Sequence, residues 1–195
     1  QFLKDGVMTL HLIQIIFFMQ KISLSKRFDF NTIKFLKISN NQKNALDLAC
    51  GKGEYSIILK KMGWRVISVD KVEIGRTKIH QFSGINYYKI NLEKNIRSMI
   101  KKKPFKKRFS LIIVFNFLNR ELLKRLPFLL KKNGFLLYKT FMIGNEKYGK
   151  PSNQNYLLRK NELLKLGSNK LKIKSFFQGK KSEKSVIQSA VFQKS

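Results

Sequence analysis

The stretch ALDLACGKG, residues 45–53, places a short apolar run directly before two glycines that one lysine separates. The apolar part is typical of a buried strand, and GEYSIILKKMG, residues 53–63, has the pattern of a helix that ends at a glycine. Gly51 and Gly53 allow the backbone to turn tightly and to approach a ligand at the first turn of that helix. The stretch therefore predicts a strand, a ligand-binding turn and a helix in direct succession.

Strands and helices alternate along the rest of the chain. FSLIIVFN, residues 109–116, is a nearly continuous apolar run, as expected of a strand that is buried on both faces. Further strands are predicted at 65–70, 85–90 and 134–141, helices at 29–38, 73–81, 93–102, 120–132 and 158–167, and a closing pair of strands at 170–177 and 185–192. This repeated alternation predicts a doubly wound α/β sandwich with a mostly parallel sheet.

The length of 195 residues suits one domain. We assign the domain to residues 28–195 and treat residues 1–27 as an N-terminal extension that is either not native or loosely packed. The apolar run at 7–19 is too short to span a bilayer as a helix, and it lacks the flanking features of a secretory signal. A single cysteine, Cys50, fits a reducing compartment. We therefore expect a cytoplasmic monomer with no membrane partner.

The second informative position is Asp70, at the end of RVISVD, residues 65–70. An acid at the end of the strand that follows a glycine-rich turn accepts hydrogen bonds from the ribose hydroxyls of a nucleoside cofactor. A dinucleotide fingerprint needs a third glycine where this chain has Ser56, and Asp47 would repel a pyrophosphate. An NAD-dependent reductase is therefore disfavoured.

Acidic residues gather around this turn. Residues 47–73 hold four of the eleven acidic residues and five basic residues, so this window is nearly neutral in a chain whose net charge is +30. A cofactor that carries an amino group and a sulfonium centre is compatible with nearby negative charge, whereas a pyrophosphate is not. The composition of the window thus favours S-adenosylmethionine over NAD.

DLACGKG (47–53) and the later Val-Asp pair at 69–70 resemble the first two motifs of class I S-adenosylmethionine-dependent methyltransferases. The resemblance covers residues 28–193 and implies a Rossmann-like three-layer sandwich whose seven-stranded sheet has an antiparallel last strand. It implies methyl transfer from S-adenosylmethionine and a cofactor site formed by Asp47, Ala49, Gly51, Gly53, Asp70, Lys71, Asn91, Leu92 and Asn116. In that site Asp70 would bind the ribose, and Asn91 would lie near the adenine amino group, where the family usually has an aspartate.

Two further blocks, NFLNREL (116–122) and LLYKTFMIGNEKYGKPSNQNYLLRKNELL (136–164), resemble a small bacterial, tellurite-resistance-like subgroup of these methyltransferases. Asn119 replaces a histidine of that subgroup, and Lys139 replaces a glutamate. Because the change at Lys139 reverses a charge beside the expected substrate pocket, the identity of the substrate does not carry over.

The acceptor is expected beyond the carboxyl ends of the fourth and fifth predicted strands, where doubly wound sheets bind ligands. We predict that Asn116, Arg120 and Glu146 orient or activate the acceptor, and that the long loop at 142–157 acts as a lid. Methyl transfer mainly requires alignment and desolvation, so a general base is optional. Glu146 and Tyr138 are the candidates for that base.

The net charge of +30 bears on whether the methyl acceptor is a small molecule or RNA. Lysine is a solvated point charge and accounts for 33 of the 41 basic residues, whereas arginine is the residue preferred for phosphate recognition. We therefore expect a small-molecule acceptor. RNA is the alternative, since residues 101–195 carry 24 basic and 4 acidic residues, and a non-catalytic nucleic-acid-binding protein is a further alternative. The densest basic run, KKKPFKKR (101–108), precedes the fourth strand and is expected at the opposite edge of the sheet as a solvated loop.

Other conspicuous residues are assigned structural roles. Cys50 is expected to be a packing residue and His80 to be exposed on a helix, and with only one cysteine and two distant histidines no metal site is predicted. Seven phenylalanines are expected in the core, namely Phe105, Phe109, Phe115, Phe117, Phe128, Phe135 and Phe141.

Overall fold

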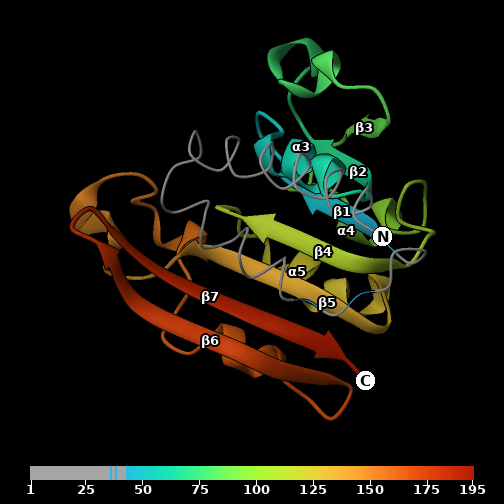
Figure 1. Cartoon of the computed structure of the whole chain (residues 1–195). Helices are drawn as coiled ribbons and strands as arrows, with labels where there is room; N and C mark the ends of the chain where they lie inside the picture. The colour runs from blue at the N-terminus through green and yellow to red at the C-terminus, as the bar shows by residue number, and fades with distance from the viewer. Residues whose placement is uncertain (1–35, 37, 39–42) are drawn as a thin grey trace, which may run out of the picture. The chain divides into compact units, whose positions relative to one another are not determined.

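A seven-stranded sheet forms the centre of the computed structural model, which describes residues 36, 38 and 43–195 (Figure 1). The strands are β1 (Asn44–Leu48), β2 (Arg65–Asp70), β3 (Ile85–Lys89), β4 (Phe109–Phe115), β5 (Leu130–Phe141), β6 (Leu171–Ser182) and β7 (Ser185–Lys194). They lie in the order β3-β2-β1-β4-β5-β7-β6. The first five strands are parallel to one another, and β7 is antiparallel to both β5 and β6. The predicted mostly parallel sheet with an antiparallel last strand is confirmed.

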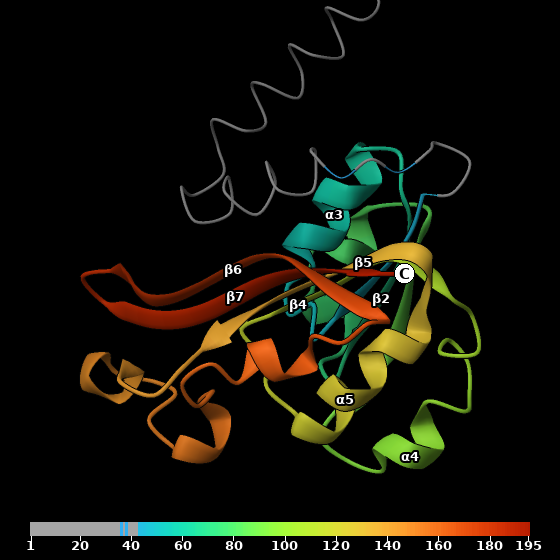
Figure 2. The ribbon, with the colours of Figure 1, turned by 90° about the horizontal axis from the view of Figure 1, so that it is seen from below.

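Helices cover both faces of the sheet. The helix α3 (Glu54–Lys61) lies on one face, and α4 (Ile96–Met99) and α5 (Arg120–Leu129) lie on the other (Figure 2). Side chains of a strand alternate between the two faces. Leu46 of β1 therefore joins the apolar core beneath α4 and α5, whereas the neighbouring Asp47 contacts α3. The predicted three-layer sandwich is confirmed, and residues 38–195 form one compact unit.

The amphipathic pattern of α5 explains where it begins and which side it buries. The Asn119 side chain caps the helix by accepting a hydrogen bond from the Leu122 amide at 2.9 Å. The leucines at the inner positions are buried, namely Leu122, Leu123, Leu126 and Leu129. Phe128 lies on the outer side with 68% of its surface exposed, so its predicted place in the core is wrong.

Tertiary pairing decides where α5 ends. The predicted helix at 120–132 stops at Leu129, and β5 begins at Leu130, four residues earlier than predicted. Leu130 pairs with Phe109 of β4, which draws this residue into the sheet. The local helical pattern is overridden at that point.

Three predicted helices are shorter than expected. Residues 73–81 form two 3₁₀ turns, Ile74–Arg76 and Ile79–Gln81, and only Ile96–Met99 of the range 93–102 is α-helical. The range 158–167 contains only the 3₁₀ turn Leu163–Leu166, because Leu158 forms a bridge with Met142 and Asn161 has a left-handed φ of 58°, and both features interrupt a helix. The predicted helix at 29–38 and the extension at 1–27 lie largely or wholly outside the described residues.

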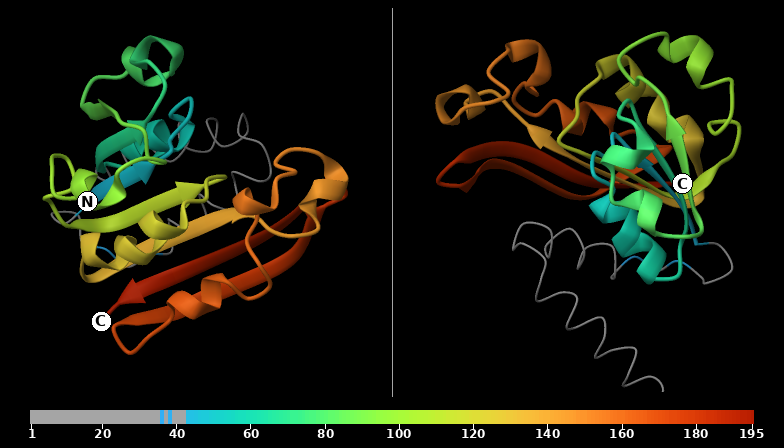
Figure 3. Two further views of the ribbon diagram at one scale, coloured as in Figure 1. Left: turned by 180° about the vertical axis from the view of Figure 1, so that it is seen from behind. Right: turned by 90° about the horizontal axis from the view of Figure 1, so that it is seen from above.

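The closing pair of strands is a long hairpin. The strands continue through most of the predicted polar connection, so that only residues 183–184 separate β6 from β7. β6 is the edge strand of the sheet (Figure 3), and its Lys172 and Lys174 are exposed. Within the described part of the chain, no helix has the length and apolar character needed to cross a membrane.

Candidate functional site

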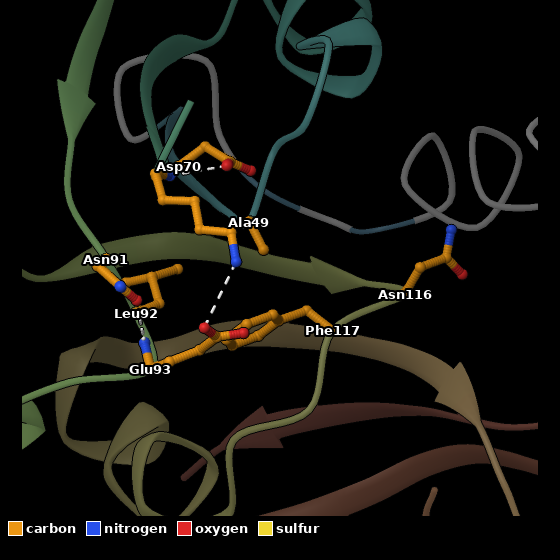
Figure 4. Close-up of a pocket in the computed structure, with 8 residues that line it drawn as sticks. Ala49, Asp70, Asn91, Leu92, Glu93, Asn116 and Phe117 are labelled. Carbon is orange, nitrogen blue, oxygen red and sulfur yellow. Dashed lines mark hydrogen bonds and ion pairs between the residues drawn. The ribbon is translucent and has the colours of Figure 1, made fainter. Parts of the chain in front are cut away.

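A cavity lies at the carboxyl ends of β1, β2 and β4 and beside the segment that follows β3. Its volume is about 210 Å³, and its lining residues are Ala49, Asp70, Lys71, Asn91, Leu92, Glu93, Asn116 and Phe117 (Figure 4). Parallel strands bring their carboxyl ends to the same edge of a sheet, and ligands bind beyond that edge. Six of the nine residues predicted to bind the cofactor line this cavity.

The turn after β1 has a left-handed backbone at alternate positions. Ala49, Gly51 and Gly53 have φ values of 53°, 56° and 79°. A side chain at Gly53 would overlap the buried Ile79, whereas Gly51 faces open space. Glycine at position 53 is therefore required for packing as well as for its φ angle. Helix α3 starts at the next residue, and the Ile57 amide donates to the Gly53 carbonyl at 3.0 Å.

Asp70 closes this turn. One carboxylate oxygen accepts a hydrogen bond from the Gly51 amide at 2.7 Å, and the other accepts from the amides of Lys71 at 2.7 Å and Val72 at 3.3 Å. A carboxylate offers about four acceptor sites, so Asp70 retains capacity for a ligand hydroxyl. Gly51 thus reaches the site through its backbone, although it is not among the residues that line the cavity.

Asp47 is buried beneath α3 and does not line the cavity. Its carboxylate accepts a hydrogen bond from the Ser56 hydroxyl at 2.5 Å, and the Ser56 oxygen accepts one from the Ser68 hydroxyl at 2.7 Å. Burial raises the pKa of Asp47 to about 7, the negative charge of Asp70 adds to the rise, and the Ser56 hydrogen bond opposes it. The two carboxylates therefore influence each other electrostatically at the glycine turn.

The far wall of the cavity follows β3. The side-chain oxygen of Asn91 accepts a hydrogen bond from the Glu93 amide at 2.9 Å, which fixes a local turn. The Lys71 ammonium reaches across to the Glu93 carboxylate at 3.4 Å. This ion pair is solvent-exposed, so it links the ends of β2 and β3 only weakly.

Strand β5 positions the residues that follow β4. The Asn116 amide donates to the Lys139 carbonyl at 2.8 Å, and the Tyr138 hydroxyl donates to the Phe117 carbonyl at 2.7 Å. Burial raises the pKa of Tyr138 well above its usual value, which keeps this hydroxyl protonated and unsuited to the role of general base. Tyr138 instead holds Phe117 at the cavity.

Lys139 is buried next to this end of the cavity, with 7% of its surface exposed. Its ammonium lies 4.7 Å from the centre of the Phe115 ring and 5.9 Å from that of Tyr55. The two rings contact each other edge to face at 4.5 Å between centroids. Aromatic faces stabilise a cation at such distances.

Two of the three predicted acceptor residues lie away from the cavity. Arg120 forms a double ion pair with Glu162 at 2.7 and 3.0 Å and donates to the carbonyls of Asn155 and Leu157. Glu146 accepts a hydrogen bond from the Gly144 amide at 2.8 Å within its own loop. Only Asn116, which is exposed and has a φ of 57°, lines the cavity.

The remaining residues singled out in the sequence are also placed. The KKKPFKKR run (101–108) precedes β4, at the end of that strand opposite the cavity. Burial raises the pKa of the Cys50 thiol well above its usual value, which agrees with a packing role. His80 is exposed on a 3₁₀ turn.

Sequence reasoning missed Glu93 as a lining residue and treated Phe117 as core. Glu93 could have been found, because an asparagine often bonds to the backbone amide two residues ahead and so fixes a turn. Phe117 could not, since an aromatic residue after a buried strand is equally compatible with the core and with a cavity wall.

Residues 23–170, more than half of the chain, match a family model described as a methyltransferase domain. Among solved structures, the N-methyltransferase NodS from Bradyrhizobium japonicum WM9 matches with a TM-score of 0.63 and 15% identity, over 87% of this chain and 96% of NodS. A NodS complex with S-adenosyl-L-homocysteine has the same TM-score and identity and covers 89% of each chain. TehB from Haemophilus influenzae matches with a TM-score of 0.59 and 20% identity, over 78% of this chain and 57% of TehB. No curated protein sequence matches the chain.

Substitution of Gly53 by alanine should cost more stability than the same change at Gly51. Both positions have a left-handed backbone, but only an added side chain at Gly53 overlaps Ile79. We expect the free energy of unfolding to fall by about 1–3 kcal/mol more in Gly53→Ala than in Gly51→Ala. Urea unfolding measures both values, and equal losses would show that packing against Ile79 is unimportant.

Asp47 should make the cofactor-free protein less stable as the pH rises. A carboxyl group whose pKa is higher in the folded state binds its proton more tightly there, so its contribution is complete below about pH 4 and is lost as the pH rises to about 7. In Asp47→Asn this loss, which amounts to at most about 4 kcal/mol, should disappear.

The measurement is urea unfolding of the wild type and of Asp47→Asn across that pH range. Glu183→Gln removes an exposed carboxylate and is the matched control, which should follow the wild type. Parallel pH profiles for the wild type and Asp47→Asn would contradict the raised pKa.

Proposed function

The chain belongs to the methyltransferase domain family, and we propose that it transfers a methyl group from S-adenosylmethionine to a small molecule. The class I methyltransferase predicted from the motifs is confirmed, and S-adenosylmethionine is its cofactor. The observation that carries the proposed site is the cavity at the carboxyl edge of the sheet, where the Asp70 carboxylate lies next to the glycine turn.

The polar and apolar groups that line the cavity fit the nucleoside part of S-adenosylmethionine. We assign the ribose hydroxyls to the Asp70 carboxylate, which has acceptor capacity left after its three backbone bonds. Leu92 and Phe117 provide apolar surface for a planar base, and Asn91 provides an amide for its polar edge. A carboxylate, an amide and apolar walls are the groups that such a ligand needs.

The carboxylates at the glycine turn fit the cationic end of the cofactor. When bound, S-adenosylmethionine supplies an electrophilic methyl group, which a lone pair of the acceptor takes up as the carbon–sulfur bond breaks. The negative charge of Asp70, and that of Asp47 when it is ionised, favours a cation at the turn. The same two charges would repel the pyrophosphate of a dinucleotide.

The protein contributes alignment and the exclusion of water rather than acid–base chemistry. We propose that Asn116 orients the acceptor, because it is the predicted acceptor residue that lines the cavity. Glu146 and Arg120 are already engaged by Gly144 and Glu162, so a direct role for either requires the loop at 142–157 to rearrange. An acceptor that carries a proton would release it to solvent or to a carboxylate brought in by that movement.

Local charge favours a small acceptor over RNA. Asp70 and Glu93 line the cavity with only Lys71 to balance them, and this excess of negative charge disfavours a phosphate backbone. The dense cations of residues 101–108 lie at the opposite edge of the sheet. A small-molecule acceptor has no phosphate backbone for the cavity to repel and does not need the cations of residues 101–108.

Replacement of Asp70 by alanine should weaken the binding of S-adenosylmethionine by about 10- to 100-fold, because hydrogen bonds to a charged group are lost. Isothermal titration calorimetry measures the affinity. Glu73→Ala is the matched control, since Glu73 is an exposed carboxylate paired only with Lys89 among the described residues, and it should bind as the wild type does. Undiminished binding by Asp70→Ala would remove this residue from the site.

The class of acceptor can be read from the fate of a tritiated methyl group. Enzyme and S-[methyl-³H]adenosylmethionine are incubated with a desalted bacterial extract supplemented with its own small-molecule fraction, and the products are separated by ultrafiltration. After unreacted S-adenosylmethionine is separated from the filtrate by chromatography, we expect a labelled product there that depends on the added enzyme, and we expect nuclease treatment of the retained fraction to release no label. Label that is retained and becomes filterable only after ribonuclease would replace the small-molecule proposal with RNA methylation.

A further inference from the structure

We propose that the outer face of α5 binds single-stranded RNA, at a surface separate from the methyl-transfer cavity. Two adjoining cavities of about 300 and 430 Å³ share Arg120 and Lys124. Together they form what we call the α5 groove, whose polar and aromatic lining includes Arg97, Arg120, Lys124, Arg125, Phe128, Arg159 and Lys165. The proposal does not rest on the proposed function, because none of these residues lines the cofactor cavity.

The spacing of residues along α5 builds one wall of the groove. Arg120, Lys124 and Phe128 follow one another at intervals of four and therefore share one face of the helix. The leucines that alternate with them are buried against the sheet, so this face has to point outward. The stripe is about 12 Å long, from a guanidinium at one end to an aromatic ring at the other.

The α5 groove is rich in arginine, although lysine is the predominant basic residue of the chain as a whole. Four of the eight arginines of the sequence line it, namely Arg97, Arg120, Arg125 and Arg159. Arginine presents a planar fork of donors that matches phosphate, and it stacks on planar rings. The abundance of lysine in the chain can follow from its overall amino-acid composition alone. The local concentration of arginine in the groove differs from that composition.

The acidic residues of the groove leave it strongly positive. Glu121 lies between Arg97 at 3.2 Å and Arg125 at 3.5 Å, and Glu162 is paired with Arg120. With Lys124, Lys165 and Arg159 there are six cations and two carboxylates, a net charge of +4. The Arg120 guanidinium is held by Glu162 and by the carbonyls of Asn155 and Leu157, so it forms a fixed part of the wall and does not offer a free fork to phosphate.

Phe128 distinguishes the partner from a simple polyanion. It is the most exposed large apolar side chain of the described residues, at 68%, and it lines the same cavity as Arg97 and Arg125. An aromatic ring among cations is the combination with which proteins bind single strands, because bases stack on the ring while the backbone follows the charge. A duplex hides its base faces, and an acidic peptide does not need the ring.

The test is fluorescence anisotropy with a labelled single-stranded RNA of about 12 nucleotides, within the usual site sizes. We expect Phe128→Ala to weaken binding at least fivefold, which is the lower limit for the loss of one stacked base. The triple variant Arg97→Gln, Lys124→Gln, Lys165→Gln should also bind more weakly and should have a smaller dependence of affinity on salt concentration.

A matched triple variant away from the groove, Lys132→Gln, Lys170→Gln, Lys184→Gln, removes the same net charge from exposed positions and should retain most of the affinity. An equal loss in both triple variants would show general charge attraction and overturn the proposal. The proposal would also be overturned if Phe128→Ala had no effect, or if duplex RNA or polyglutamate competed as well as the single strand.

The same variants separate this proposal from the proposed function. Calorimetric affinity for S-adenosylmethionine should be unchanged in Phe128→Ala, which also verifies that the variant is folded. Failure of RNA binding with intact cofactor binding would refute the groove alone. Failure of cofactor binding in the wild type would refute the enzyme proposal and leave the groove to be judged by its own measurements.

Discussion

The hydrogen bond from the Gly51 amide to the Asp70 carboxylate ties the turn after β1 to the end of β2, and the site depends on it. The bond forms because the left-handed turn aims this amide at the neighbouring strand. Helix α3 starts directly beyond Gly53, close enough for Ser56 to reach back to Asp47. One short turn thus fixes an accessible carboxylate at the cavity and a buried one beneath the helix.

Much of the fold was predictable from the sequence, because the buried strands are continuous apolar runs bounded by polar residues. The errors occur where distant contacts decide the outcome. Residues 158–167 have a helical pattern, but Leu158 pairs with the chain next to the end of β5, and the following turn at Asn161 has a left-handed φ of 58°. Phe128 is a different kind of error, because it was assigned to the core for its apolar character alone. Its spacing of four residues from Lys124 already places it on the outer face of α5, opposite the buried leucines.

The cofactor side of the site was more predictable than the acceptor side. Asp70 ends β2 and Asn91 follows β3, and the parallel topology alone brings them to one edge. Arg120 and Glu146 were placed by the same rule, but both belong to segments whose side chains are turned by local bonds that spacing does not determine. Asn116 lines the cavity because the Lys139 carbonyl holds its backbone. The topology therefore predicts at which edge of the sheet a residue lies, but it does not predict the direction in which the side chain of that residue points.

The lysines along β6 give part of the large positive charge a role that involves no ligand. An edge strand exposes unpaired backbone groups to which the edge of another molecule can add, and charged side chains along it oppose such pairing. Lys172 and Lys174 project from this strand near the exposed Ile173 and Phe177, the apolar residues that would favour sheet extension. The charge at this edge therefore protects the protein against aggregation, and loss of these lysines would expose a template for intermolecular sheet growth.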